Sequence, residues 1–166
     1  MDDRCGAAAI LRALEILGSS ETRFNVSVIF STQEELGERG AKIGAFTLDA
    51  DIALAVDVSF AYAIGEDEQK CGKLGGGPMI GISPSLDRQL SEELIAVSER
   101  ENIPYQREVM SGLTSTNADQ YSVSRGGARA CTVSIPLRNM HTPVEVIDLA
   151  DVENTARLLA QYIKEA

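Results

Sequence analysis

The sequence predicts an α/β domain in which helices flank a mostly parallel sheet, and three observations indicate this fold class. Apolar runs of strand length alternate with segments of helix length along the chain. Residues 52–58 are almost continuously apolar, as expected for a strand buried on both faces of a parallel sheet. The length of 166 residues fits one domain, and no internal repeat divides it.

The first third of the chain predicts two helices and two strands. Residues 7–17 are rich in Ala, Leu and Ile, which favour a helix, and Gly18 ends it. Residues 25–32 contain a run of apolar residues and predict a strand, and residues 37–46 predict a short helix. The apolar run 52–58 follows as the second strand.

The rest of the chain continues this alternation after a glycine-rich loop at residues 65–78. The helix 85–102 is predicted from leucines at helical spacing, which form an amphipathic face. The remaining expected elements are strands at 79–82, 105–110 and 130–135, a short helix at 118–124, and a closing helix at 151–163 with Asp148 as its cap.

Composition excludes several classes of function. The net charge of −10 and a pI near 4.6 argue against binding to nucleic acid or to anionic membranes, since both require a basic patch. No apolar run is long enough to cross a bilayer, and no segment resembles a signal peptide. The three cysteines lack a Cys-x-x-Cys spacing and fit a reducing compartment. We therefore expect a cytoplasmic protein without nucleic-acid or membrane partners.

Acidic residues follow the predicted strands, where open α/β sheets bind their ligands. Glu34 and Glu35 close the first predicted strand, and Asp57 lies near the end of the second. Successive side chains of an extended segment point in opposite directions, so one of the paired glutamates can hold a metal while the other faces water. His141, the only histidine, follows the last predicted strand. We expect these residues and Asp2 to converge in a site for metal-assisted hydrolysis.

Six short motifs occur in a fixed order over almost the whole chain: Asp2-Asp3-Arg4, Gln33-Glu34-Glu35-Leu36-Gly37, Ala55-Val56-Asp57-Val58, Gly75-Gly76-Gly77-Pro78, Thr114-Ser115-Thr116-Asn117-Ala118-Asp119 and Met140-His141-Thr142-Pro143-Val144-Glu145. Together they resemble the tetrahedral or deblocking aminopeptidases, a family that includes glutamyl aminopeptidases and has also been labelled endoglucanase M. The resemblance implies a three-layer, zinc-peptidase-like fold. It also implies that residues 1–166 are the carboxyl-terminal portion of a catalytic domain, without the amino-terminal strands and the inserted dimerisation domain.

The function implied by this resemblance is that of a two-metal aminopeptidase, which removes amino-terminal residues from peptides. Matched to the family motifs, Asp2 bridges the two metals, Glu35 and His141 complete one site, and Asp57 belongs to the other. Glu34 is then the general base that acts on the activated water. Zinc or cobalt fits such a mixed nitrogen and oxygen ligand set.

The resemblance also implies what this chain lacks. The family's remaining metal ligand is a histidine in a His-x-Asp segment that is not in this sequence, so the Asp57 site has two of its three protein ligands. We expect low or no activity from the isolated chain, and a homo-oligomer that covers the open edge of the sheet. Thr116, in the fifth motif, and Arg138, in the segment Ile135-Pro136-Leu137-Arg138 that precedes the sixth, are expected to contact the substrate, with pairing to a nearby carboxylate as the alternative for Arg138.

Four alternatives remain open. The chain is a non-catalytic metal-binding or scaffold fragment if the incomplete site is retained without turnover. A nucleotide-binding site at residues 72–77 would need glycine spacings that this segment lacks. Catalysis by Cys131 and His141 requires an accessible thiol in a predicted strand. A glycosidase requires two opposed carboxylates around a sugar groove.

Overall fold

The computed structural model describes residues 1–165. Two short 3₁₀ turns, η1 (Glu34–Leu36) and η2 (Glu68–Lys70), accompany the regular elements. The helices are α1 (Arg4–Leu17), α2 (Arg39–Leu48), α3 (Arg88–Arg100), α4 (Ala118–Tyr121) and α5 (Leu149–Glu165). The strands are β1 (Ile52–Phe60), β2 (Met79–Ile82), β3 (Gln106–Val109), β4 (Arg129–Arg138) and β5 (Val146–Ile147).

The strands form one mixed sheet with the order β1-β4-β2-β3, and β5 pairs with the end of β4. Parallel pairing dominates: nine residue pairs join β1 to β4 and four join β2 to β3. The antiparallel pairings of β4 with β2 and with β5 comprise two residue pairs each. The expected α/β class with a mostly parallel sheet is therefore confirmed.

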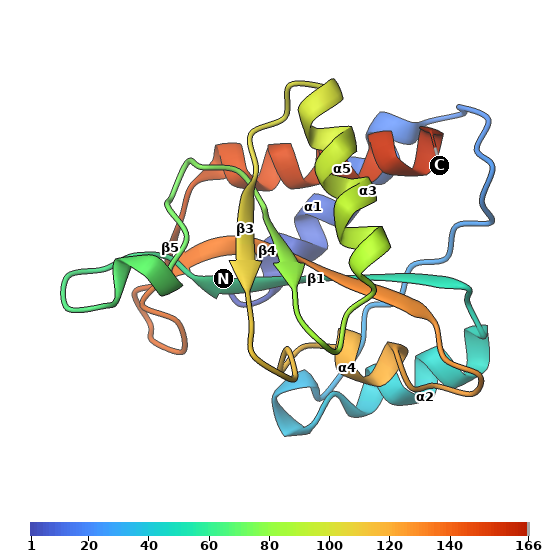
Figure 1. Ribbon diagram of the computed structural model, residues 1–166, viewed down its shortest axis with the longest axis horizontal. Helices are drawn as coiled ribbons and strands as arrows, with labels where there is room; N and C mark the ends of the chain where they lie inside the picture. The colour runs from blue at the N-terminus through green and yellow to red at the C-terminus, as the bar shows by residue number, and fades with distance from the viewer. Residues whose placement is uncertain (166) are drawn as a thin grey trace.

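Helices cover both faces of the sheet, which gives three layers (Figure 1). The side chains of Val133 and Ile135 in β4 belong to the apolar core beneath α1, α3 and α5. Ser134 lies between them in sequence and so points to the opposite face, where α4 packs against β1 and β4. Asp57 is the register partner of Ser134 and shares that face.

The predicted strand at 25–32 is wrong. These residues form no strand among residues 1–165, although 25–30 run without helix or turn, and Val26 and Phe30 are exposed. The alternating pattern specifies an extended chain, but a strand also needs a partner for its backbone groups. The outer edge of β1 is likewise unpaired in the part of the chain described, and a cavity of about 580 Å³ lies between it and residues 23–29.

The other predicted elements are present with shifted ends. α1 begins at Arg4 instead of residue 7 because the Asp3 carboxylate accepts a hydrogen bond from the Gly6 amide at 2.9 Å and caps the helix. β4 continues through Pro136 to Arg138. The cap predicted at Asp148 is confirmed, since its carboxylate accepts from the Ala150 amide at 2.8 Å.

One smaller difference concerns the end of the sheet. Strand β5 has only two residues, which are too few for an apolar alternation to predict a strand. No helix in residues 1–165 combines the length and the apolar composition that a membrane span requires.

Candidate metal centre

Three of the predicted site residues meet at one point. The His141 Nε2 atom lies 3.2 Å from the Asp2 Oδ2 atom and 3.3 Å from the Glu35 Oε1 atom. All three potential ligand atoms fall within 4.8 Å of one another, and this is the one such group of three among the described residues. The sequence separates these residues widely, so the fold brings the segment before α1, the turn η1 and the loop after β4 together.

Local structure explains where each side chain lies. Asp2 directly precedes the Asp3 cap, so the start of α1 fixes its position. Glu35 lies in the 3₁₀ turn η1, between left-handed residues Gln33 and Gly37. His141 follows β4 in a loop that the Thr142 hydroxyl closes by donating to the Asn139 carbonyl at 2.6 Å.

The three donors fit a divalent metal ion. Two ligands of a tetrahedral zinc ion, each about 2.0–2.1 Å from the metal, lie roughly 3.3 Å apart. The measured separations of 3.2 and 3.3 Å from the His141 nitrogen agree with that value. One imidazole nitrogen and two carboxylate oxygens are donors that suit zinc or cobalt.

Three further carboxylates interact with this group. Burial, followed by the negative charge of Asp3, raises the pKa of Asp57 to about 8, and the charges of Glu34 and Asp2 add to the effect. Burial also raises the pKa of Asp3 to about 7 and shifts the pKa of Glu34 upward. Without a cation, these acids disfavour one another's ionisation, and a divalent ion would relieve that repulsion.

Asp57 and Glu34 are therefore electrostatically coupled to the three converging residues but are not part of the group of three. Asp57 is buried within β1, three residues before its end, and its carboxylate accepts from the Val58 amide at 2.8 Å. Glu34 precedes Glu35 in η1, which places the two neighbouring carboxylates at the same turn. The cavity beside β1 is lined by none of the predicted site residues.

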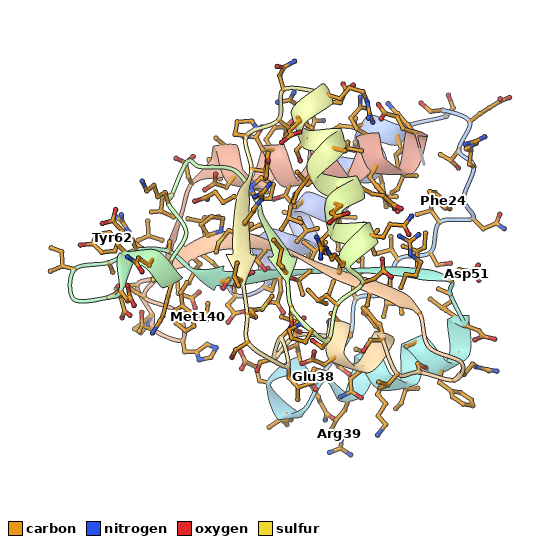
Figure 2. The ribbon with its side chains drawn as sticks, in the orientation of Figure 1. Phe24, Glu38, Arg39, Asp51, Tyr62 and Met140 are labelled. Atoms are coloured by element: carbon orange, nitrogen blue, oxygen red, sulfur yellow. The ribbon has the colours of Figure 1, made fainter. Side chains whose placement is uncertain are left out.

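The two residues assigned to the substrate pocket are held by backbone contacts. The Arg138 Nε atom donates to the Tyr62 carbonyl at 2.6 Å, and no ion pair of Arg138 is found within residues 1–165. Tyr62 and Met140 lie on the same side of the molecule in Figure 2, where the loop after β4 emerges. Thr116 is buried, and its hydroxyl accepts from the Ala118 amide at 3.2 Å.

Two alternatives from the sequence lose support. The amides of Gly75 and Gly77 donate to the buried Asp151 carboxylate at 2.8 and 2.7 Å, so they do not point at a phosphate. Burial raises the pKa of Cys131 to about 11, and this fully buried thiol is not a nucleophile at neutral pH.

Sequence reasoning assigned no role to Asp3 or Glu145, although both lie in the quoted motifs. Asp3 is partly buried and its charge raises the pKa of Asp57, and Glu145 accepts hydrogen bonds from the backbone on both sides of the cluster. The available signal was adjacency: Asp3 follows Asp2, and Glu145 follows His141 by four residues.

This arrangement defines a class of protein, an α/β domain in which two acids and one imidazole converge at distances that could hold a metal ion. Residues 1–158 match the profile of the family described as M42 glutamyl aminopeptidase. The chain belongs to this family.

Named relatives agree with this assignment. The lysyl aminopeptidase of Pyrococcus furiosus is 33% identical over 165 residues, which are 99% of this chain and 47% of that protein. The glutamyl aminopeptidase of Lactococcus lactis is 26% identical over 152 residues, covering 90% of this chain and 42% of the relative. The chain spans about half the length of the curated relatives it matches.

Solved structures share the fold. The aminopeptidase APDkam598 from the archaeon Desulfurococcus kamchatkensis superposes with a TM-score of 0.92 at 37% identity, over 99% of this chain and 48% of that one. The TET1 peptidase of Pyrococcus horikoshii gives a TM-score of 0.82 at 29% identity, again over 99% and 48%. That peptidase assembles into a tetrahedron or a large octahedral shell.

Proposed function

We propose that the protein acts as a metal-dependent aminopeptidase that removes single residues from the amino termini of peptides. The observation that carries this proposal is the meeting of Asp2, Glu35 and His141 at ligand distances in a chain of the M42 family. The aminopeptidase names of its relatives support the substrate class. Two zinc or cobalt ions are the proposed cofactors.

The proposed ligands divide between two sites. Asp2, Glu35 and His141 would hold one ion, and Asp57 would hold the second together with Asp2. When bound, such ions lower the pKa of water toward ~7 and polarise the carbonyl of the bond to be cleaved. Asp57 needs to be ionised for this role, and the second cation would offset the burial and neighbouring charges that raise its pKa.

Glu34 is the proposed general base, and its surroundings suit that role. Burial raises its pKa, and the adjacent charges of Glu35 and Glu38 raise it further. A base whose pKa lies closer to neutrality takes a proton more readily and still ionises at the working pH. Glu34 adjoins Glu35 in η1 and feels the charges of Asp2 and His141 but is not one of the converging three, which supports a role next to the proposed ligands.

Several finer features belong to the same proposal. The sequence contains a single histidine, so we propose that the second site is weaker in this chain and that the isolated 166 residues turn over peptides slowly. We propose that Arg138 and Thr116 border the substrate. A homo-oligomer is supported by the assemblies of structural neighbours, and the three free cysteines support a cytoplasmic location.

The test is metal analysis combined with a peptidase assay on the protein loaded with zinc or cobalt. We expect one tightly bound ion per chain, lost in His141→Ala, and hydrolysis of aminoacyl anilides that falls at least 100-fold in Glu34→Gln while the bound metal is retained. Glu38→Gln is the control that removes a nearby charge. Unchanged activity in Glu34→Gln would contradict the mechanism, and metal binding without any turnover would favour the scaffold alternative.

A further inference from the structure

The Glu145 carboxylate bridges two segments that carry proposed metal ligands. Its Oε1 atom accepts from the His141 amide at 3.0 Å, and its Oε2 atom accepts from the Asp2 amide at 3.2 Å. The Met1 amino nitrogen also donates to Oε2. The Glu145 side chain is only 11% exposed. One carboxylate therefore ties the start of the chain to the loop after β4.

The loop that carries His141 depends on such a tie. His141 has a φ of +60°, a left-handed conformation that non-glycine residues rarely adopt, and its side chain is 62% exposed. Bonds inside the loop join Thr142 to Asn139 and Asn139 to the Val144 carbonyl. These bonds shape the loop but do not connect it to residue 2.

Within residues 1–165, the hydrogen bonds between residues 1–3 and the loop 139–145 all end on Glu145 oxygens. The one other polar contact between these segments joins the proposed ligands themselves, Asp2 and His141. Before a metal is bound, Glu145 therefore supplies the polar link between the Asp2 and His141 backbones, beside the apolar packing of Met140 against the cluster that contains Cys5 and Ala9. Its own oxygens are not part of the group of three.

We propose that Glu145 is a positioning residue for the metal centre, and this inference rests on the proposed function. By receiving the amides of Asp2 and His141, it holds the Asp2 Oδ2 and His141 Nε2 atoms at a separation that suits a shared ion. Hydrogen bonds to an ionised acceptor are the stronger kind, which makes the carboxylate suitable for this task. Groups that orient metal ligands typically change metal affinity by 10- to 100-fold when they are removed.

The experiment titrates Co²⁺ into the full chain and into Glu145→Ala and Glu145→Gln, with calorimetry for affinity and visible absorption for coordination. We expect Glu145→Ala to bind 10- to 100-fold more weakly and with an altered absorption band. Glu145→Gln retains one acceptor oxygen, so its loss is expected to be smaller. This variant is nearly isosteric and carries the test if the alanine variant does not fold.

Two controls separate positioning from simple charge loss. Glu38→Gln removes a carboxylate near Glu34 without contact to the backbone of residue 2 or residue 141, and we expect a change below threefold. Wild-type affinity and spectrum in both Glu145 variants would overturn this inference while leaving the proposed function intact. Failure of the unsubstituted chain to bind Co²⁺, or full binding by His141→Ala, would instead overturn the proposed function.

Discussion

Glu108 is a partly buried carboxylate whose only polar contacts among the described residues are two serine hydroxyls. Ser134 donates to it at 2.8 Å, and Ser59 donates to its other oxygen. Burial raises its pKa, although both hydroxyls act in the opposite direction. In the unfolded chain a glutamate titrates near ~4.3. The folded state therefore keeps this proton to higher pH than the unfolded state.

This difference makes stability depend on pH in a defined direction. The contribution of Glu108 to stability falls as pH rises from the unfolded pKa through the raised folded pKa. We expect Glu108→Gln to increase the free energy of unfolding by about 1 kcal/mol at pH 8 and by almost nothing at pH 4. Urea denaturation at both pH values measures the change, with the exposed Glu66→Gln as control. A gain of equal size at pH 4 would contradict the explanation.

Asp151 holds the glycine-rich loop in place by accepting hydrogen bonds from loop amides, so these amides are not available to bind a phosphate. Its fully buried carboxylate accepts from the amides of Gly75 and Gly77. Asp151→Asn turns one acceptor into a donor that faces another donor, and we expect a loss of about 2–3 kcal/mol in unfolding free energy. Asp148→Asn, at the partly buried cap of α5, should cost less than 1 kcal/mol because asparagine caps helices equally well. Equal losses in the two variants would argue against this account.

β2 approaches β4 so closely that one of its residues must lack a side chain. A Cβ atom on Gly81 would lie 2.0 Å from the Thr132 hydroxyl and 2.8 Å from Leu86. We expect Gly81→Ala to lower the free energy of unfolding by about 1–3 kcal/mol, because the surrounding core must shift. Gly126→Ala, where a Cβ atom meets nothing within 4 Å, is the matched control and should be nearly neutral. Thermal unfolding of both variants provides the measurement.

The elements that were predicted correctly share one property: their apolar side chains and backbone groups find partners within this chain. The run 52–58 becomes β1 because β4 lies beside it, and the leucines of 85–102 become α3 because they cover β2. Residues 25–32 also contain an apolar run, but among the described residues no strand pairs with them, and a cavity separates residues 23–29 from the open edge of β1. Local pattern determines an extended backbone, whereas a strand requires tertiary pairing, and a single segment does not encode that partner.

The candidate site was predictable to a similar degree. Asp2, Glu35 and His141 were expected to meet, and they do. The prediction that Glu35 lies at the end of a strand is wrong, because Glu35 follows an unpaired segment. Glu145 was missed because its role depends on which amides lie near it, and only the folded backbone shows that.

The open edge of β1 predicts association of the chain in solution. Unpaired backbone groups on β1 and the exposed side chains of Val26 and Val28 border the same cavity. We expect light scattering coupled to size-exclusion chromatography to show oligomers. A double variant, Val26→Lys with Val28→Lys, should shift the distribution toward monomer, since charges at an edge oppose pairing.

The control for association is Leu149→Lys, which changes a more exposed apolar residue at the start of α5, outside the residues that line this cavity. It should leave the distribution unchanged. A monodisperse monomer of the unsubstituted chain would show that the open edge does not drive association.

The joining of Asp2 to His141 also sets an order of events during synthesis. A polypeptide that emerges amino terminus first exposes its early acids long before the imidazole leaves the ribosome. Closing so long a loop is entropically costly and depends on much of the remaining fold. The nascent chain would therefore complete the proposed metal site only after the segment that carries His141 has been synthesised and has folded.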